Sequence, residues 1–304
     1  MSGICDGRIV IVTGSGRGLG RAHAVELARQ GARVVVNDLG CELDGSGGGT
    51  GPAGEVVEEI RAGGGEAIAN GVDVADFAGA ERMVAAALEA FGGLDVVVSN
   101  AGFVRDRMFA NAAEDEWDAV IRVHLKGHFA VARHAAAHWR DQAKGGTPVD
   151  ARLINTSSGA GILGSVGQAA YSAAKAGIAT LTLVQAAELG RYGVTANALC
   201  PAARTRMTEG VFTEMMATPD APNAFDAMAP ENVSPLVAWL ASSESAHVTG
   251  RMFEVEGGKV GVATGWQHGP TTDKGGRWDV AELGAVVDGL LAEAPHAAPV
   301  YGTQ

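Results

Sequence analysis

The fold of this 304-residue chain is decided by the stretch Arg8-Ile-Val-Ile-Val-Thr13-Gly14-Ser-Gly-Arg-Gly18-Leu-Gly20. A β-branched run ends in a glycine-rich turn, and a segment with helical periodicity follows from Gly18 to about Gln30. A second β-branched run comes next, Arg33-Val-Val-Val-Asn-Asp38. Short apolar runs on both sides of a helix predict a βαβ unit with two buried parallel strands.

The same alternation continues along the chain. Further strands are expected at residues 94–99, 151–157, 194–199 and 251–255, and helices at residues 76–90, 115–140, 170–191 and 231–242. Right-handed crossovers then give an α/β fold, a single doubly wound (Rossmann-type) domain with about seven parallel strands.

Three segments interrupt this pattern. Residues 40–54 carry seven glycines and no apolar periodicity, which predicts a long loop. Residues 202–230 hold four methionines and two phenylalanines, which predicts either a surface hairpin or an adaptable lid over a substrate. Nothing after Gly257 suggests a second core, and one amphipathic helix is expected at residues 278–293. We therefore assign residues 1–260 to the Rossmann domain and residues 261–304 to a C-terminal helical appendage.

Composition restricts the partners and the compartment. The chain has 23 Lys and Arg against 35 Asp and Glu, a net charge of -12, which disfavours nucleic acid and anionic lipid. The three cysteines, Cys5, Cys41 and Cys200, are unclustered, so neither a disulfide framework nor a thiolate metal site is expected. No apolar run of about 18 residues and no apolar leader occur. These features predict a cytoplasmic protein.

The glycine-rich turn is typical of a dinucleotide site. Glycines permit positive φ and let backbone approach a pyrophosphate at a helix N-terminus. The residues assigned to this contact are Gly14, Ser15, Gly16, Arg17, Gly18, Leu19 and Gly20. Asp38, about 20 residues further on, can accept hydrogen bonds from a ribose and would repel a 2′-phosphate by roughly 4 kcal/mol at about 4 Å. Arg17 could offset that repulsion, but the pattern favours NAD over NADP.

A tyrosine and a lysine lie four residues apart in Tyr171-Ser-Ala-Ala-Lys175, so both lie on one helical face. An ammonium beside a phenol can lower the pKa of the phenol towards neutrality, which suits proton transfer. Ser158, at the end of a predicted strand, could hydrogen-bond a carbonyl or an alcohol.

Together these motifs resemble the short-chain dehydrogenase/reductase family over residues 5 to about 260. The matching segments are Thr13-Gly-x-x-x-Gly-x-Gly20, Asn100-Ala-Gly102, Ser158 and Tyr171-x-x-x-Lys175. The resemblance implies that Tyr171 transfers the proton, Ser158 polarises the carbonyl, and Lys175 lowers the pKa of Tyr171 and binds the nicotinamide ribose. It also implies cofactor contacts at Asp73, Val74, Asn100, Ala101, Gly102, Pro201 and Thr205, although Ala202 replaces the glycine that usually follows the proline.

A second departure concerns the relay asparagine of that family, whose position holds His124. The segment Val123-His-Leu-Lys-Gly127, with Val36-Asn-Asp-Leu-Gly40, Arg105-Asp-Arg107 and Arg206-Met-Thr208, resembles the (3R)-hydroxyacyl-CoA dehydrogenase module of peroxisomal multifunctional enzyme type 2. The resemblance makes His124 a catalytic candidate. It also implies a homodimer or homotetramer built on the alanine-rich helices.

The sequence therefore predicts an NAD-dependent enzyme that interconverts a 3-hydroxyacyl-CoA and a 3-oxoacyl-CoA. The arginines Arg105, Arg107, Arg204 and Arg206 are candidates for pairing with CoA phosphates. A steroid alcohol and an acyl-carrier-protein thioester remain alternative substrates, and an inactive cofactor-binding subunit is the alternative of another class. The pairs His124/His128 and His134/His138 have i, i+4 spacing but lack a third ligand, so no metal is expected.

Overall fold

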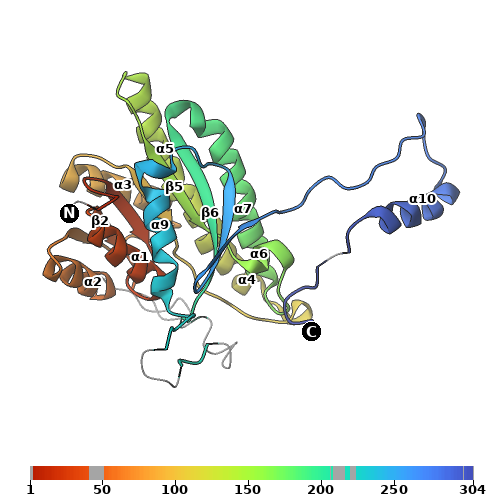
Figure 1. The fold of residues 1–304 in the computed structure, drawn as a ribbon, viewed down its shortest axis with the longest axis horizontal. Helices are drawn as coiled ribbons and strands as arrows, with labels where there is room; N and C mark the ends of the chain where they lie inside the picture. Colours follow the sequence, from red (N-terminus) through yellow and green to blue (C-terminus); the bar gives the residue numbers. More distant parts are fainter. Residues whose placement is uncertain are drawn as a thin grey trace.

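The structure is a computed structural model that describes residues 3–40, 51–205, 207, 216–219, 224–296 and 298–303. One sheet crosses the centre of the molecule, and helices cover both of its faces (Figure 1). The strand order is β3-β2-β1-β4-β5-β6-β7-β8. The strands are β1 Ile9–Thr13, β2 Arg33–Asn37, β3 Glu66–Asn70, β4 Val96–Ser99, β5 Ala151–Thr156, β6 Val194–Ala202, β7 Arg251–Glu256 and β8 Lys259–Ala263.

Strands β1 to β7 pair in parallel, and β8 pairs antiparallel with β7. The expected doubly wound α/β fold with seven parallel strands is confirmed. The principal helices are α1 Gly18–Arg29, α2 Gly51–Ala62, α3 Phe77–Phe91, α4 Glu114–Ile121, α5 Gly127–Lys144, α6 Gly159–Leu163, α7 Ala169–Leu189, α9 Ser234–Ala241 and α10 Val280–Glu293.

Two cores lie on opposite faces of the sheet because side chains alternate along each strand. In β1, Val10 and Val12 pack against α1, α2 and α9, whereas Ile9 and Ile11 pack against α3 and α5. Strands that are buried on both faces are predominantly apolar, which is why β1, β2 and β4 contain continuous runs of valine and isoleucine.

The order of the sheet creates a crevice. Strand β1 pairs with β2 on one side and with β4 on the other, so the chain direction of the crossovers reverses between β1 and β4. In an open parallel sheet, ligands bind at such a switch point, outside the carboxyl ends of the strands. The glycine-rich turn after β1 and the Asn100-Ala-Gly102 turn after β4 both lie at this edge.

Several elements differ from the expectations, and one of them is β3, a strand that was not expected at residues 66–70. The loop predicted at residues 40–54 was placed too far along the chain at its end, because α2 begins at Gly51. Residues 41–50 lie outside the described part of the chain. The sheet continues past residue 260 through β8. The single helix expected at 115–140 is interrupted by a π-helical turn, η2, at Arg122–Lys126.

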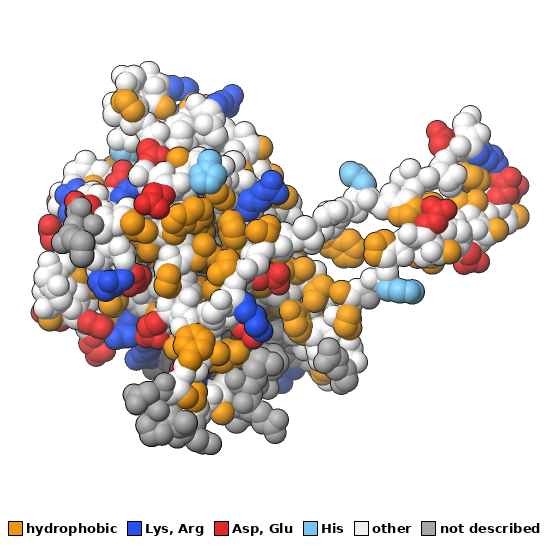
Figure 2. All heavy atoms as spheres, viewed as in Figure 1, with side chains coloured by type: hydrophobic (Ala, Val, Ile, Leu, Met, Phe, Trp, Pro, Cys, Tyr) orange, Lys and Arg blue, Asp and Glu red, His pale blue; other side chains and the backbone are white. Residues whose placement is uncertain are grey.

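Beyond β8 the chain leaves the body of the protein, forms α10 and returns (Figure 1). None of the described residues of α10 is buried, and Val280 and Leu291 are 84% and 65% exposed. Hydrophobic side chains follow this helix in the space-filling view (Figure 2). The returning segment pairs with the body at an isolated bridge between Ser165 and Tyr301. Among the described helices, none has the length and apolar content needed to cross a lipid bilayer.

Candidate active site

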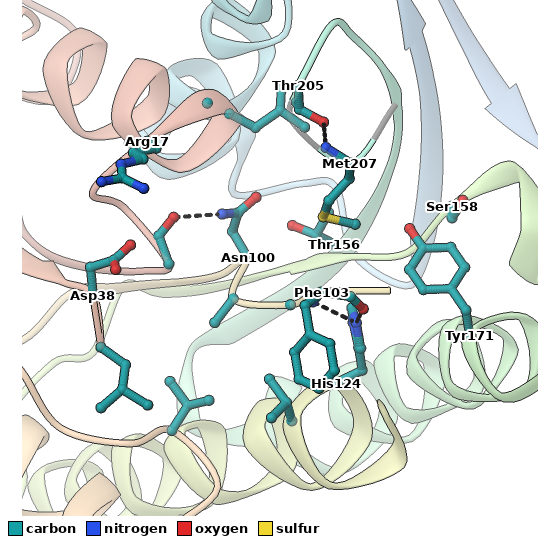
Figure 3. A pocket seen from close by; sticks show the side chains of 18 of the residues that line it. Arg17, Asp38, Asn100, Phe103, His124, Thr156, Ser158, Tyr171, Thr205 and Met207 are labelled. Atoms are coloured by element: carbon teal, nitrogen blue, oxygen red, sulfur yellow. Dashed lines mark hydrogen bonds between the residues drawn. The ribbon is translucent and has the colours of Figure 1, made fainter. Parts of the chain in front are cut away.

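A cavity of about 460 Å³ lies at the switch point. It collects nearly all of the residues singled out from the sequence: Gly14, Arg17, Gly18, Leu19, Asp38, Asp73, Val74, Asn100, Ala101, Gly102, His124, Ser158, Tyr171, Lys175, Pro201 and Thr205. Arg17 and Asp38 lie at one end, and Ser158 and Tyr171 lie at the other (Figure 3). The cavity is therefore long and has a charged end and a hydroxyl-bearing end.

The glycine turn is shaped so that backbone reaches the cavity. Gly14 and Gly18 have φ of 61° and 52°, which side-chain-bearing residues rarely adopt. A Cβ on Gly14 would lie 2.6 Å from Cα of Ala101, so the two turns approach closely. Gly18 is the first residue of α1, so the open N–H groups of that helix face the cavity end of the turn. This cradle fits a pyrophosphate group.

Ser15, Gly16 and Gly20 do not line the cavity and instead support the turn. The hydroxyl of Ser15 donates to the carbonyl oxygen of Val12 at 2.7 Å. A Cβ on Gly20 would lie 2.1 Å from the carbonyl oxygen of Gly14, which only glycine avoids. Their assignment to the cofactor therefore stays a prediction, and the geometry gives them a structural role.

Asp38 is fixed beside the turn by two backbone donors. The N–H of Gly16 donates to Oδ2 at 2.8 Å, and the N–H of Gly40 donates to Oδ1 at 2.7 Å. The carboxylate is thus held at the cavity end, and its remaining lone pairs can accept from hydroxyl groups. Arg17 extends over the same end in Figure 3, so one positive and one negative side chain face each other across it.

Asp73 forms an ion pair with Arg122, and both side chains line the cavity. Oδ1 of Asp73 also accepts from the N–H of Ala75 at 2.8 Å. Arg122 was not anticipated from the sequence, because its partner lies 49 positions away. Val74 is buried beside them and supplies an apolar wall.

Tyr171 and Ser158 meet at the other end of the cavity (Figure 3). Burial raises the pKa of Tyr171 to about 12, and a hydrogen bond with the Ser158 side chain lowers it in part. Oγ of Ser158 accepts from the N–H of Ala160 at 3.2 Å as the N-cap of α6. Because that bond uses only a lone pair, the hydroxyl proton of Ser158 can still be donated.

Lys175 lies one helical turn after Tyr171 and is 2% exposed. Its Nζ donates to the carbonyl oxygen of Thr156 at 2.7 Å and lies 5.4 Å from the centre of the Tyr171 ring. Burial lowers the pKa of Lys175 to about 7. A dry pocket disfavours both the ammonium and the phenolate when each is alone, but the two charges stabilise one another.

His124 lies in the π-helical turn η2, beside Phe103 (Figure 3). Its Nε2 is 2.7 Å from the carbonyl oxygen of Phe103, and its ring stands edge-on to Tyr171 with 5.2 Å between centroids. A Cβ on Gly102 would lie 2.1 Å from Cε1 of His124, which explains the glycine there. Burial holds the pKa of His124 well below its usual value, so the ring is neutral.

The loop that carries Ser158 is enclosed on two sides. A Cβ on Gly161 would lie 2.7 Å from the backbone carbon of Lys175, and a Cβ on Gly159 would lie 2.8 Å from the hydroxyl oxygen of Tyr301. The N–H of Val166 donates to the carbonyl oxygen of Tyr301 at 2.9 Å. The returning C-terminal segment therefore supports the outer side of α6, which the sequence did not indicate.

The candidate arginines divide into different environments. Arg105 lines the cavity, with its guanidinium carbon 5.3 Å from the centre of the Phe103 ring. Arg107 forms an ion pair with Glu116 at 2.7 Å, and Arg204 pairs with Asp226. Arg206 lies outside the described residues. Of the three candidates for CoA phosphates that lie within the described residues, Arg105 is the one that lines the cavity.

The region predicted as a lid lies only partly within the described residues, because 206, 208–215 and 220–223 fall outside them. Pro201, Ala203, Thr205 and Met207 nevertheless line the cavity, so the start of this region forms one of its walls. The N–H of Met207 donates to Oγ1 of Thr205 at 3.3 Å (Figure 3). No group of three or more potential metal ligands gathers within the described ranges.

A crevice at the switch point, with a Ser/Tyr/Lys group at one end, is the arrangement expected of an oxidoreductase that acts on CH–OH groups. The model of the short chain dehydrogenase family matches residues 8–215, and the chain belongs to that family.

Individual proteins agree with this assignment. The hydroxyacyl-CoA dehydrogenase ChsB1 of Mycobacterium tuberculosis is 48% identical over 294 residues, which are 94% of this chain and 89% of the relative. Peroxisomal multifunctional enzyme type 2 of Mus musculus is 45% identical over 256 residues, 84% of this chain but 32% of that protein. The crystal structure of a short chain dehydrogenase from Mycobacterium avium superposes with a TM-score of 0.89 at 63% identity, covering 99% of this chain and 100% of that one. The resemblance stated from the sequence is confirmed.

Proposed function

We propose that this protein is an NAD-dependent 3-hydroxyacyl-CoA dehydrogenase, which interconverts a 3-hydroxyacyl-CoA and a 3-oxoacyl-CoA. The observation that carries the chemistry is the hydrogen-bonded pair of Ser158 and Tyr171, next to the buried Lys175, at one end of a cavity whose other end holds Asp38. The thioester substrate is supported by the mycobacterial relative that bears the name hydroxyacyl-CoA dehydrogenase.

The residues fit a nicotinamide dinucleotide. The glycine cradle would hold the pyrophosphate, Asp38 the adenosine ribose, and Asn100 to Gly102 with Pro201 and Thr205 the nicotinamide half. When bound, this cofactor accepts or returns a hydride at the substrate carbon. The protein must then bind the oxygen of the substrate, move one proton and exclude water.

Tyr171 is the group that moves the proton. In reduction its Oη donates a proton to the developing alkoxide, and in oxidation its phenolate accepts the hydroxyl proton. The hydroxyl of Ser158 donates a hydrogen bond to the same substrate oxygen and stabilises its charge. Lys175, as an ammonium, stabilises the phenolate and lowers the pKa of Tyr171 from the high value that burial alone produces.

Substrate identity is tested by steady-state kinetics. With NAD, kcat/KM for a 3-hydroxyacyl-CoA is expected to exceed that for a 17β-hydroxysteroid by at least about a hundredfold, because the binding energy of the CoA portion is lost with the steroid. The same measurement in the reductive direction compares 3-oxoacyl-CoA with the acyl-carrier-protein thioester. The absence of turnover with every thioester would contradict the proposed substrate. The absence of any carbonyl or alcohol turnover would favour the inactive cofactor-binding subunit.

The proposal includes a homodimer or homotetramer in the cytoplasm. A groove of about 440 Å³ runs between α5 and α7, and the apolar residues Phe129 and Val184 beside it are each 45% exposed. Covering such a face with a second copy would remove apolar surface from water. Light scattering is expected to give a multiple of the 30.9 kDa chain mass, and a monomer mass would exclude the oligomer. The unpaired, buried thiols of Cys5 and Cys200 are consistent with a reducing compartment.

A further inference from the structure

The histidine pair His124 and His128, which has the spacing of metal ligands, has another use in the structure. Both rings are at most 2% exposed. His128 is the second residue of α5, which follows directly after the π-helical turn that carries His124. Nδ1 of His128 is 2.7 Å from the carbonyl oxygen of His124, and its Nε2 is 3.4 Å from the backbone N–H of Thr156.

The protonation state of His128 follows from its surroundings. Burial lowers its pKa to about 3, the charge of Lys175 contributes in the same direction, and the carbonyl oxygens of His124 and Ser99 act in the opposite sense. The ring is therefore neutral and carries one proton. We place this proton on Nδ1, because the 2.7 Å contact with the carbonyl oxygen of His124 is the shorter of the two, and Nε2 then accepts from the N–H of Thr156 at 3.4 Å.

These bonds form a continuous buried connection to the catalytic lysine. The carbonyl oxygen of Thr156 accepts from Nζ of Lys175 at 2.7 Å, while the N–H of the same residue donates to His128. At the other nitrogen, His128 binds the turn that holds His124 against the edge of the Tyr171 ring. The imidazole of His128 thus connects the end of β5, which binds Lys175, with the π-helical turn, which carries His124. Lys175 and His124 both lie beside Tyr171.

We propose that His128 is a positioning residue that holds the Lys175 amine and the His124 ring in place for proton transfer by Tyr171. A neutral imidazole suits this role, because it offers one donor and one acceptor on opposite sides at a fixed separation. The titratable groups near it are Lys175 from α7 and His124 from η2. The inference rests on the proposed role of Tyr171 and Lys175 and not on the identity of the acyl substrate.

The test replaces His128 with Phe, which keeps the ring and its burial but removes both hydrogen bonds. We expect kcat to fall about tenfold and the apparent pKa of the pH–rate profile to rise by about one unit, since a displaced ammonium stabilises the phenolate less. Binding of NADH, followed by its fluorescence, is expected to weaken and gives a readout without turnover. His128→Asn places an amide donor near the Nδ1 position and is expected to restore most of kcat.

His134→Phe is the matched control. His134 lies on the same helix, is also buried, and packs against Phe77 on α3 with 4.4 Å between centroids. This control is expected to change thermal stability while leaving the pH profile and NADH binding unaltered. If His128→Phe loses stability but keeps the wild-type pH profile, or if His128→Asn is no better than Phe, His128 is only a packing residue and the inference is wrong.

If His128→Phe does not accumulate as folded protein, His128→Leu replaces it, because Leu also removes both hydrogen bonds. A wild-type pH profile in His128→Leu would contradict the inference. The rates are measured with any carbonyl substrate that the wild-type protein reduces, so failure with acyl-CoA esters would refute the proposed substrate and leave this experiment unaffected.

Discussion

The Tyr171→Phe variant is expected to lose about a thousandfold in kcat while binding NADH with unchanged affinity. The variant removes one hydroxyl, the atom that exchanges a proton with the substrate, and general acid–base catalysis by one positioned group contributes about 10² to 10⁴. The ring itself remains to pack against His124. The measurement is kcat with the best thioester, together with the Kd of NADH from its fluorescence.

Tyr192→Phe is the matched control for this variant, since Tyr192 lies in the groove between α5 and α7, away from the cavity. It is expected to keep wild-type turnover. Near-wild-type turnover by Tyr171→Phe itself would show that another group transfers the proton. The pH dependence supplies a second check. Because burial favours protonated Tyr171, reduction is expected to hold up to the apparent pKa and fall above it, whereas oxidation rises with pH.

Asp38→Ala is expected to raise kcat/KM with NADP by up to about a thousandfold relative to NAD. The carboxylate and a 2′-phosphate about 4 Å apart repel by roughly 4 kcal/mol at an effective dielectric constant near 20, and screening by solvent reduces that value. The guanidinium of Arg17, which extends over the same end of the cavity, would then be left to bind the phosphate (Figure 3). The measurement is kcat/KM with each cofactor at one fixed ionic strength.

Asp38→Asn separates charge from structure. The N–H groups of Gly16 and Gly40 both donate to Asp38, so Ala leaves two donors without their acceptors, whereas Asn keeps one acceptor and removes the charge. If repulsion sets the preference, both variants are expected to shift the ratio of NAD to NADP activity. An unchanged ratio in both would exclude Asp38 as the discriminating residue.

The centre of the sheet could be predicted from the sequence because strands buried on both faces contain continuous apolar runs. The run from Ile9 to Val12 has this property. Strand β8 has a weaker signal, since it is an edge strand in which Val260 and Val262 are 62% and 56% exposed. The π-helical turn at Arg122–Lys126 could not be predicted, because one extra residue in a turn leaves the apolar pattern of the flanking helices nearly intact.

The site divides in the same way. Residues whose placement follows from backbone geometry, such as Gly14, Ser158 and the Tyr171/Lys175 pair, lie where the sequence predicted them. The contacts of long side chains could not be predicted, because their partners are distant in sequence or depend on local packing. Arg204, a candidate for pairing with a CoA phosphate, forms an ion pair with Asp226 instead. The sequence also gave no sign that burial would dominate the pKa of Tyr171, since burial depends on the complete fold.

The contact between Tyr301 and Gly159 has a practical consequence. Residues near the carboxyl terminus touch the loop that carries Ser158, although more than 140 positions separate the two segments. A purification tag fused just past this tyrosine, or a shortened version ending before it, would disturb the support of α6. Recombinant protein intended for kinetics is therefore better tagged at the opposite end, and assays of versions that differ in their last few residues should not be compared directly.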